Sequence, residues 1–189
     1  MIVRPPYSSN LDRAPLSPRG ESQIRDLARG WPVAPPTAVI ASPLRRSIES
    51  AIVLATAFGR SISKRACLKE WSADDSGIPQ AEYMALEHRA WADFQFIPPN
   101  KESLEQAAIR SRRCLDEIGA SHASETTAVV GHATMFSLVI AGLKGEAPTE
   151  AYKNSIGFGA AAILDSGSGL HLVSDFRNYA PKPGPIPNP

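Results

Sequence analysis

The stretch TAVVGHATMFSLVIAGL, residues 127–143, indicates which class of fold the chain adopts. Its first four residues, 127–130, form the short apolar run that is typical of a buried strand. Gly131 and His132 then lead directly into an apolar segment with helical spacing, which continues through Ile140. A buried strand that turns at once into a helix is the repeating unit of α/β proteins with parallel sheets.

The same order of strand and helix recurs toward the N-terminus. Residues 38–41 (AVIA) form a second short apolar run and predict another buried strand. The following residues, 42–58, begin with a Ser-Pro cap and predict a helix that ends near Gly59. An earlier helix is predicted over residues 17–30, because Ser-Pro again supplies an N-cap and a proline in the first turn.

The most strongly predicted helix lies in KESLEQAAIRSRRCLDEIG, residues 101–119. It carries one continuous apolar face, and Ser103 and Gln106 have the spacing of a capping box. Before it, residues 71–99 form a loop-rich segment with several aromatic side chains. We expect these aromatic side chains to form a small satellite core over the sheet rather than a wall for a substrate.

Together these segments predict a three-layer α/β/α sandwich with a mainly parallel central sheet. A further strand is expected at residues 62–68, and residues 160–164 and 170–173 predict a hairpin at the edge of the sheet. Residues 1–180 are expected to form one domain. Residues 181–189 (PKPGPIPNP) are too rich in proline for a helix or a central strand, and predict a mobile tail.

Composition limits the partners that the chain is expected to bind. The 189 residues are 43% hydrophobic and 21% charged, with a net charge of +1, so we expect no broad electrostatic binding of nucleic acid or membrane. No signal peptide or membrane-spanning run is recognised, which favours a cytoplasmic protein. Cys67 and Cys114 are far apart in the sequence, and we expect them to be buried free thiols in a reducing compartment. The oligomeric state stays open, with a homodimer as one alternative.

Three side chains that can carry positive charge follow predicted strands. Arg4 follows a short apolar strand at Val3, Arg46 follows residues 38–41, and His132 follows residues 127–130. Ligands of open α/β sheets bind beyond the carboxyl ends of the strands, so these groups are candidates for one anion site. Guanidinium groups and helix N-termini suit a phosphate or a carboxylate. The neighbouring Arg45 is expected to be a solvated surface residue.

Five segments, which occur along the chain in the family's order, resemble the histidine phosphatase superfamily, the branch of cofactor-dependent phosphoglycerate mutases and broad-specificity phosphatases. ASPLRRSIESA (41–51) resembles the S-x-L-x-R-A-x-x-T-A helix start, LKE (68–70) the L-x-E element, and VVGHATMFSLVIAGL (129–143) the V-V-S-H-G segment. LSPRGESQ (16–23) is similar to the L-T-x-x-G-x-x-Q helix entry, and PPNKESLEQAAIRSRRCLDEI (98–118) to the P-P-G-G-E-S helix.

The resemblance implies a phosphoglycerate mutase-like fold and phosphate-ester chemistry with no metal and no cofactor. It assigns phosphate binding to Arg4, Arg46 and His132, and catalytic roles to Glu70 and His132. In members with the full motif, the histidine of R-H-G attacks phosphorus to give a phosphohistidine, and the acidic residue protonates the leaving oxygen.

The chain departs from the family pattern at the nucleophile. The R-H-G motif aligns with Arg4, Pro5 and Pro6, so that Pro5 occupies the position of the lost nucleophile. Proline has no lone pair to offer phosphorus, and Pro6 also removes a backbone N–H. The hydroxyl groups of residues 7–9 are close in sequence, but an unactivated hydroxyl is a poor nucleophile.

Two hypotheses follow from the sequence. The leading one is a pseudophosphatase that binds a phosphorylated or carboxylated small molecule through Arg4, Arg46, Glu70 and His132 without forming phosphohistidine. The alternative is an active phosphatase or other acid-base hydrolase, in which water attacks directly and Glu70 or His132 carries the proton.

Overall fold

The structure, a computed structural model, describes residues 13–179 of the chain. Arg4, Pro5, the predicted opening strand and the predicted tail at residues 181–189 lie outside the described residues. The elements are α1 (Pro18–Arg29), β1 (Ala38–Ala41), α2 (Arg45–Phe58), β2 (Ile62–Lys64), the 3₁₀ helix η2 (Ala66–Leu68), α3 (Gln80–Ala92), α4 (Leu104–Ser121), β3 (Thr127–Val130), α5 (Ala133–Lys144), α6 (Glu150–Ser155), β4 (Ala161–Asp165) and β5 (His171–Arg177).

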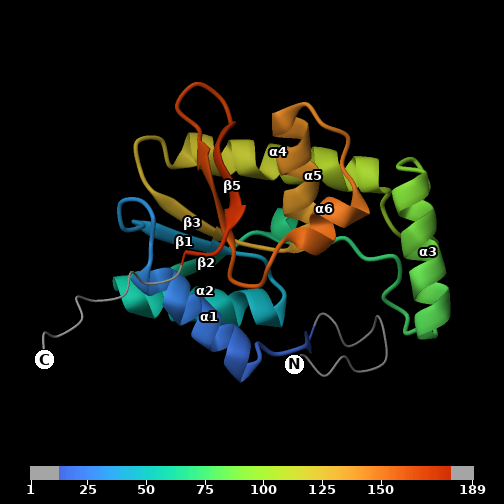
Figure 1. Ribbon diagram of the computed structural model, residues 1–189, viewed down its shortest axis with the longest axis horizontal. Coiled ribbons are helices and arrows are strands. Elements are labelled where there is room, and N and C mark those ends of the chain that lie inside the picture. The colour runs from blue at the N-terminus through green and yellow to red at the C-terminus, as the bar shows by residue number, and fades with distance from the viewer. Residues whose placement is uncertain (1–12, 180–189) are drawn as a thin grey trace, which may run out of the picture.

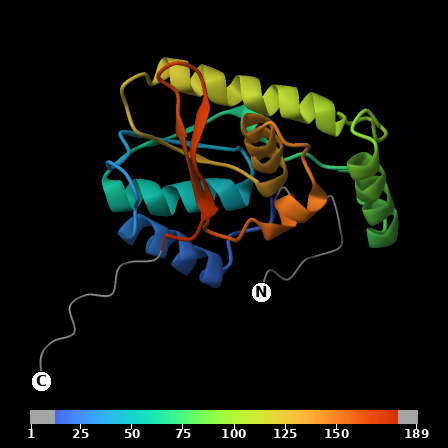
Figure 2. The same cartoon turned by 45° about the horizontal axis from the view of Figure 1, so that its top comes forward.

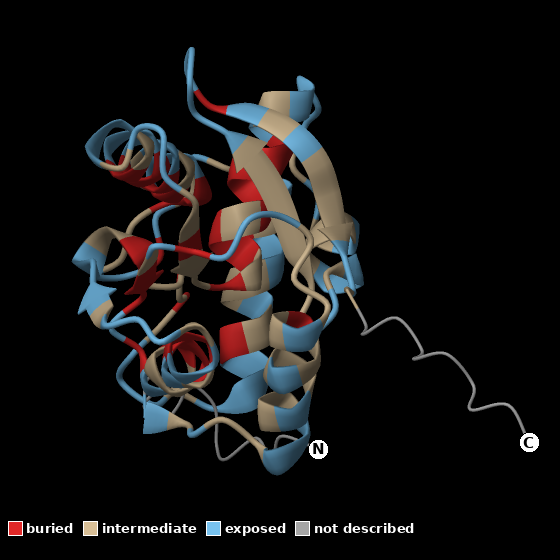
Figure 3. Ribbon diagram, turned by 90° about the vertical axis from the view of Figure 1, so that its left-hand side faces the viewer, coloured by how far each residue is buried: buried red, intermediate tan, exposed pale blue. Residues whose placement is uncertain are grey.

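The central sheet confirms the predicted architecture. Its described strands are parallel and run in the order β2-β1-β3, with α1 and α2 on one face and α4 and α5 on the other (Figures 1 and 2). Side chains of β1 alternate between the two faces. Val39 and Ala41 pack against α2, whereas Ile40 packs against Leu115 of α4 and Met135 of α5. Figure 3 shows this buried core between the layers.

The predicted starts of two helices are confirmed at atomic detail. Ser17 caps α1, since its hydroxyl accepts a hydrogen bond from the backbone N–H of Gly20. At α4 the capping box is complete: Ser103 Oγ accepts from the N–H of Gln106, and Gln106 Oε1 accepts from the N–H of Ser103. By contrast, α2 begins at Arg45, three residues later than the predicted Ser-Pro cap at Ser42. The hydroxyl of Ser42 contacts His132 instead.

Two strand predictions need correction. The strand expected over residues 62–68 ends at Lys64, and the chain then turns through η2. The predicted hairpin does form, and its second strand extends to Arg177. Within residues 13–179, however, β4 and β5 pair only with each other in a separate antiparallel sheet. This hairpin packs on α5, where the rings of Phe136 and Phe176 lie 6.1 Å apart.

The aromatic segment before α4 forms a satellite core, as expected. Trp71 and Tyr83 are buried in a cluster with Leu104, and further aromatic side chains of the segment pack against it. The cluster includes part of α3, a helix that the sequence did not predict. A largely buried ion pair, 2.9 Å between Lys153 Nζ and Glu87 Oε1, fastens α3 to the equally unpredicted α6.

The cysteines do not form the expected free thiols. Cys67 of η2 and Cys114 of α4 form a disulfide, with their Cα atoms 5.8 Å apart. The expectation was wrong because the two residues are separated by 47 positions, and only the packing of η2 on α4 brings them together. Of the helices within residues 13–179, none is long and apolar enough to cross a membrane.

Candidate active site

The ends of β1 and β3 bring the two helix starts of the site together. Ala41 is the pairing partner of Val130, so the chain leaves both strands at the same point of the sheet. The carbonyl of Val130 accepts two hydrogen bonds, from the N–H of Ser42 (2.9 Å) and from the hydroxyl of Ser47 (2.8 Å). The N-terminus of α2 is therefore held directly beside the turn that precedes α5.

The glycine of that turn, Gly131, lies close to an aromatic side chain of α5. A Cβ atom at Gly131 would lie 2.5 Å from the ring of Phe136, well inside van der Waals contact. The next residue, His132, is the N-cap of α5 in extended conformation. Any larger residue at position 131 would displace the phenylalanine ring or move His132.

His132 is buried and has a defined partner. Only 7% of the residue is exposed, and its Nε2 lies 2.7 Å from the hydroxyl of the fully buried Ser42, with either group able to be the donor. The same hydroxyl accepts from the N–H of Leu44 at 3.3 Å. Ser42 thus orients the imidazole ring instead of capping α2. The residue was missed in the sequence, although it is the serine of the S-x-L-x-R resemblance.

The environment of His132 keeps its imidazole neutral. Burial, with a smaller contribution from the positive charge of Arg46, lowers the pKa of His132 from 6.5 to about 3. The histidine was expected as a group that can carry positive charge. In the structure it serves as a neutral hydrogen-bonding group at physiological pH.

Glu70 is attached to the same helix N-terminus. Its two carboxylate oxygens accept hydrogen bonds from the backbone N–H groups of Thr134 (3.1 Å) and Met135 (3.2 Å), in the first turn of α5. A third hydrogen bond comes from the N–H of Trp71 at 2.9 Å. Burial raises the pKa of Glu70, although these N–H groups and the charge of Arg46 act in the opposite direction.

Arg46 is the cation of this group. It lies in the first turn of α2, is partly buried, and is close enough to lower the pKa of both His132 and Glu70. Its neighbour Arg45 is different: the side chain is 58% exposed and forms an ion pair with Glu49 at 2.7 Å. The expectation that Arg45 is a surface residue is confirmed.

The structure therefore brings together three of the residues singled out in the sequence, Arg46, Glu70 and His132. Arg4 and Pro5 lie outside the described residues. The other histidines lie elsewhere, and His88, for example, faces Glu150 at 3.4 Å with a largely exposed side chain. Among residues 13–179, no group of three or more His, Cys, Asp and Glu side chains could hold a metal ion.

Chemically, the group combines a permanent cation, a neutral imidazole and a carboxyl group that is easier to protonate than usual. A guanidinium and an imidazole N–H can bind the oxygens of an anion, and a carboxyl group with a raised pKa can donate a proton. Fold and site together define an α/β protein in which a guanidinium, an imidazole and a carboxyl group lie at the carboxyl edge of parallel strands.

The family of the chain follows from its sequence. The histidine phosphatase superfamily (branch 1) matches residues 6–174, and the chain belongs to this family. The match begins after Arg4 and Pro5, so the alignment of these two residues with the family motif stays a prediction. No curated protein was found to match the sequence.

Solved structures share the fold. YhfR of Bacillus stearothermophilus superposes with a TM-score of 0.72 at 18% identity, over 86% of this chain and 84% of that chain. A mycobacterial glucosyl-3-phosphoglycerate phosphatase gives 0.69 at 22% identity, over 92% and 90% of the two chains. The alpha-ribazole phosphatase of Shigella flexneri gives 0.67 at 22% identity, over 92% and 89%. These similarities show a phosphoglycerate mutase-like fold.

Proposed function

We propose that the protein is a pseudophosphatase that binds a phosphorylated or carboxylated small molecule without forming a phosphohistidine. The observation that carries the proposal is the convergence of Arg46, His132 and Glu70 at one end of the sheet. Arg4 is proposed to complete the anion pocket as a second cation. Pro5 is proposed to stand where the family has its nucleophile.

The charges of the described residues are compatible with an anionic ligand. Arg46 supplies a charge that does not titrate, and the neutral His132 can direct one N–H toward an oxygen while its other nitrogen stays with Ser42. A deprotonated Glu70 would repel an anion. Because burial raises the pKa of Glu70, its protonated form is more accessible than that of an exposed glutamate, and can donate to the ligand.

The proposal predicts that Arg46→Ala weakens the binding of inorganic phosphate or vanadate by about 10-fold to 100-fold. This is the range expected when a charge-assisted hydrogen bond is lost. Isothermal titration calorimetry on the full chain measures the change. Arg45→Ala is the matched control, since the two arginines are adjacent but Arg45 is directed to Glu49. Unchanged phosphate affinity in Arg46→Ala, or no phosphate binding by the wild-type chain, would contradict the proposed site.

The second candidate function is phosphatase activity by direct attack of water. The raised pKa of Glu70 favours it, because a carboxyl group of this kind can protonate a leaving oxygen. If this candidate is right, the wild-type chain hydrolyses an aryl phosphate, and both Glu70→Gln and His132→Ala lose about 10²-fold or more of the rate. Absence of turnover in a chain that binds phosphate supports the pseudophosphatase.

The ligand is proposed to be a small molecule rather than nucleic acid or a membrane, because the net charge is only +1. A cytoplasmic location is likewise a proposal. The expected free thiols do not support this location, because Cys67 and Cys114 form a disulfide and disulfides persist mainly in oxidising compartments.

A further inference from the structure

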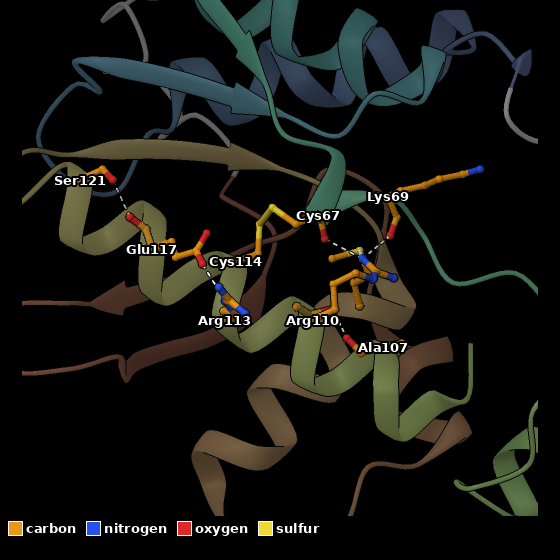
Figure 4. Close-up of a disulfide and its surroundings, with 10 residues drawn as sticks. Cys67, Lys69, Ala107, Arg110, Arg113, Cys114, Glu117 and Ser121 are labelled. Atoms are coloured by element: carbon orange, nitrogen blue, oxygen red, sulfur yellow. Dashed lines mark hydrogen bonds and ion pairs between the residues drawn. A yellow bond between two sulfur atoms is a disulfide. The ribbon is translucent and has the colours of Figure 1, made fainter. Parts of the chain in front are cut away.

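Arg110 of α4 links this helix to the segment that precedes Glu70. Its Nη1 donates to the backbone carbonyl of Cys67 at 2.6 Å and to that of Lys69 at 3.0 Å (Figure 4). The same nitrogen lies 3.6 Å from the sulfur of Met135. One guanidinium therefore contacts both the chain before Glu70 and a residue of the helix turn to which Glu70 is bound.

Glu102 fixes the opposite side of this guanidinium. Arg110 Nε lies 3.0 Å from Glu102 Oε2, and Nη2 contacts Glu102 Oε1 as well, which gives a bidentate pair. The carbonyl of Glu102 in turn accepts from the buried indole N–H of Trp71 at 2.9 Å. The planar fork of arginine satisfies a carboxylate and two carbonyls at once, which a lysine ammonium on its flexible stem cannot reproduce.

The contacts of Arg110 bear directly on the position of Glu70. The carbonyl of Lys69 belongs to the peptide bond that joins it to Glu70, so a displacement of this carbonyl moves the backbone of Glu70. The carboxylate of Glu70 depends on that backbone to reach the N–H groups of Thr134 and Met135. The disulfide between Cys67 and Cys114 fastens the same segment to α4 by a covalent bond.

We propose that Arg110 is a positioning residue that holds Glu70 against the N-terminus of α5, and that the Cys67–Cys114 disulfide is a second, redox-dependent attachment of the same segment. The inference rests on the proposed function, because Glu70 belongs to the proposed site. Its test needs no bound phosphate, so the role of Arg110 and the proposed phosphate binding can fail separately.

Hydrogen exchange at two backbone amides reports the position of Glu70. In Arg110→Met, the amides of Thr134 and Met135 are expected to exchange about tenfold faster or more, because the carboxylate that protects them is released. Amides in the interior of α5, such as that of Val139, are expected to change much less. NMR on the full chain resolves these positions one by one.

A second readout is the ionisation of Glu70 itself, followed by the ¹³C shift of its carboxyl group. Release from its partly buried position is expected to move the pKa of Glu70 down, toward that of an ordinary glutamate. Arg113→Met is the matched control: Arg113 lies three residues further along α4, its side chain is 81% exposed, and it pairs with Glu117. Arg113→Met should alter neither the two amides nor the carboxyl titration.

Reduction of the disulfide is tested by the same measurement, the hydrogen exchange of the amides of Thr134 and Met135. A water-soluble phosphine gives two electrons to the S–S bond and becomes the phosphine oxide, while water supplies its oxygen and the two thiol protons. A surface hollow of about 480 Å³ is lined by both cysteines, and the partly exposed Cys67, rather than the buried Cys114, is the sulfur that the reagent can reach. Reduction is expected to accelerate exchange at Thr134 and Met135 modestly in the wild-type chain. The acceleration should be larger in Arg110→Lys, where one of the two attachments is already weakened.

Two results would overturn the proposal. One is an Arg110→Met chain in which exchange at Thr134 and Met135 and the titration of Glu70 are unchanged. The other is acceleration spread evenly over α5, which would mean that Arg110 supports the fold as a whole. If Arg110→Met does not fold, Glu102→Gln and Arg110→Lys, which weaken the same fork with smaller changes, are judged by the same two readouts.

Discussion

Replacing Pro5 by histidine and Pro6 by glycine is expected to produce a chain that forms an acid-labile phosphohistidine. The substitutions restore the R-H-G motif of the family at the position where the resemblance places it, next to Arg4. In the proposed function the described residues supply the other groups of this chemistry: a cation in Arg46, an imidazole in His132 and a proton donor in Glu70. Aryl phosphatase activity should rise by about 10²-fold or more.

The control for this gain is the double variant Pro5→Asn with Pro6→Gly. It makes the same change to the backbone but offers no nucleophilic nitrogen, so it should form no phosphoenzyme. Radiolabelled phosphate that is retained after denaturation, and released by acid, identifies the phosphohistidine. A folded Pro5→His, Pro6→Gly chain that stays unlabelled would show that the pocket has diverged from the family beyond the nucleophile, and would contradict the prediction.

Acidification is expected to destabilise the folded chain strongly through His132. In the unfolded chain this histidine takes up a proton near pH 6.5, whereas in the folded chain it does so at about pH 3. Between these two values the unfolded state binds more protons, so stability falls as the pH falls. For this single residue the loss amounts to about 4 kcal/mol in free energy of unfolding between pH 7 and pH 3.

Urea unfolding at a series of pH values measures this loss. His132→Gln lacks the titrating group, so its stability should fall by about 4 kcal/mol less than that of the wild type between pH 7 and pH 3. The pKa of Glu70 is raised in the folded chain, so above pH 4.5 this residue makes the folded state more stable as the pH falls. This effect is common to the wild type and His132→Gln and cancels in their comparison. If stability falls equally with pH in the wild type and in His132→Gln, His132 is not the buried neutral histidine that destabilises the chain in acid.

The placement of the site residues could be predicted where local rules apply. Arg46 and His132 follow two strands whose carboxyl ends share one edge of the sheet, and parallel pairing then brings them together. Glu70 follows no such rule, and was found only through the family resemblance. The charge of His132 was not predictable, because it depends on burial by side chains from other elements.

The parts of the fold that the sequence did not predict are those held by long-range contacts. In α3, Tyr83 and Ala90 are the buried residues, and its N-cap, Pro79, forms no side-chain cap hydrogen bond. A side-chain start signal was therefore lacking, although Tyr83, Leu86 and Ala90 of this helix have helical spacing. It is held instead by tertiary contacts, including the pair of Glu87 with Lys153. The disulfide was likewise not predicted, because its two cysteines are 47 positions apart and are brought together only by tertiary packing.

The disulfide also gives the chain a modular organisation. Its bond joins η2 to α4 and encloses, as one covalent ring, the segment that carries Glu70, the aromatic cluster and α3. Cys67 and Cys114, which close this covalent ring, both lie in elements that pack on the central sheet. Insertions or replacements between Ala73 and Asn100 would therefore change the ring's interior segment while the two cysteines keep their places.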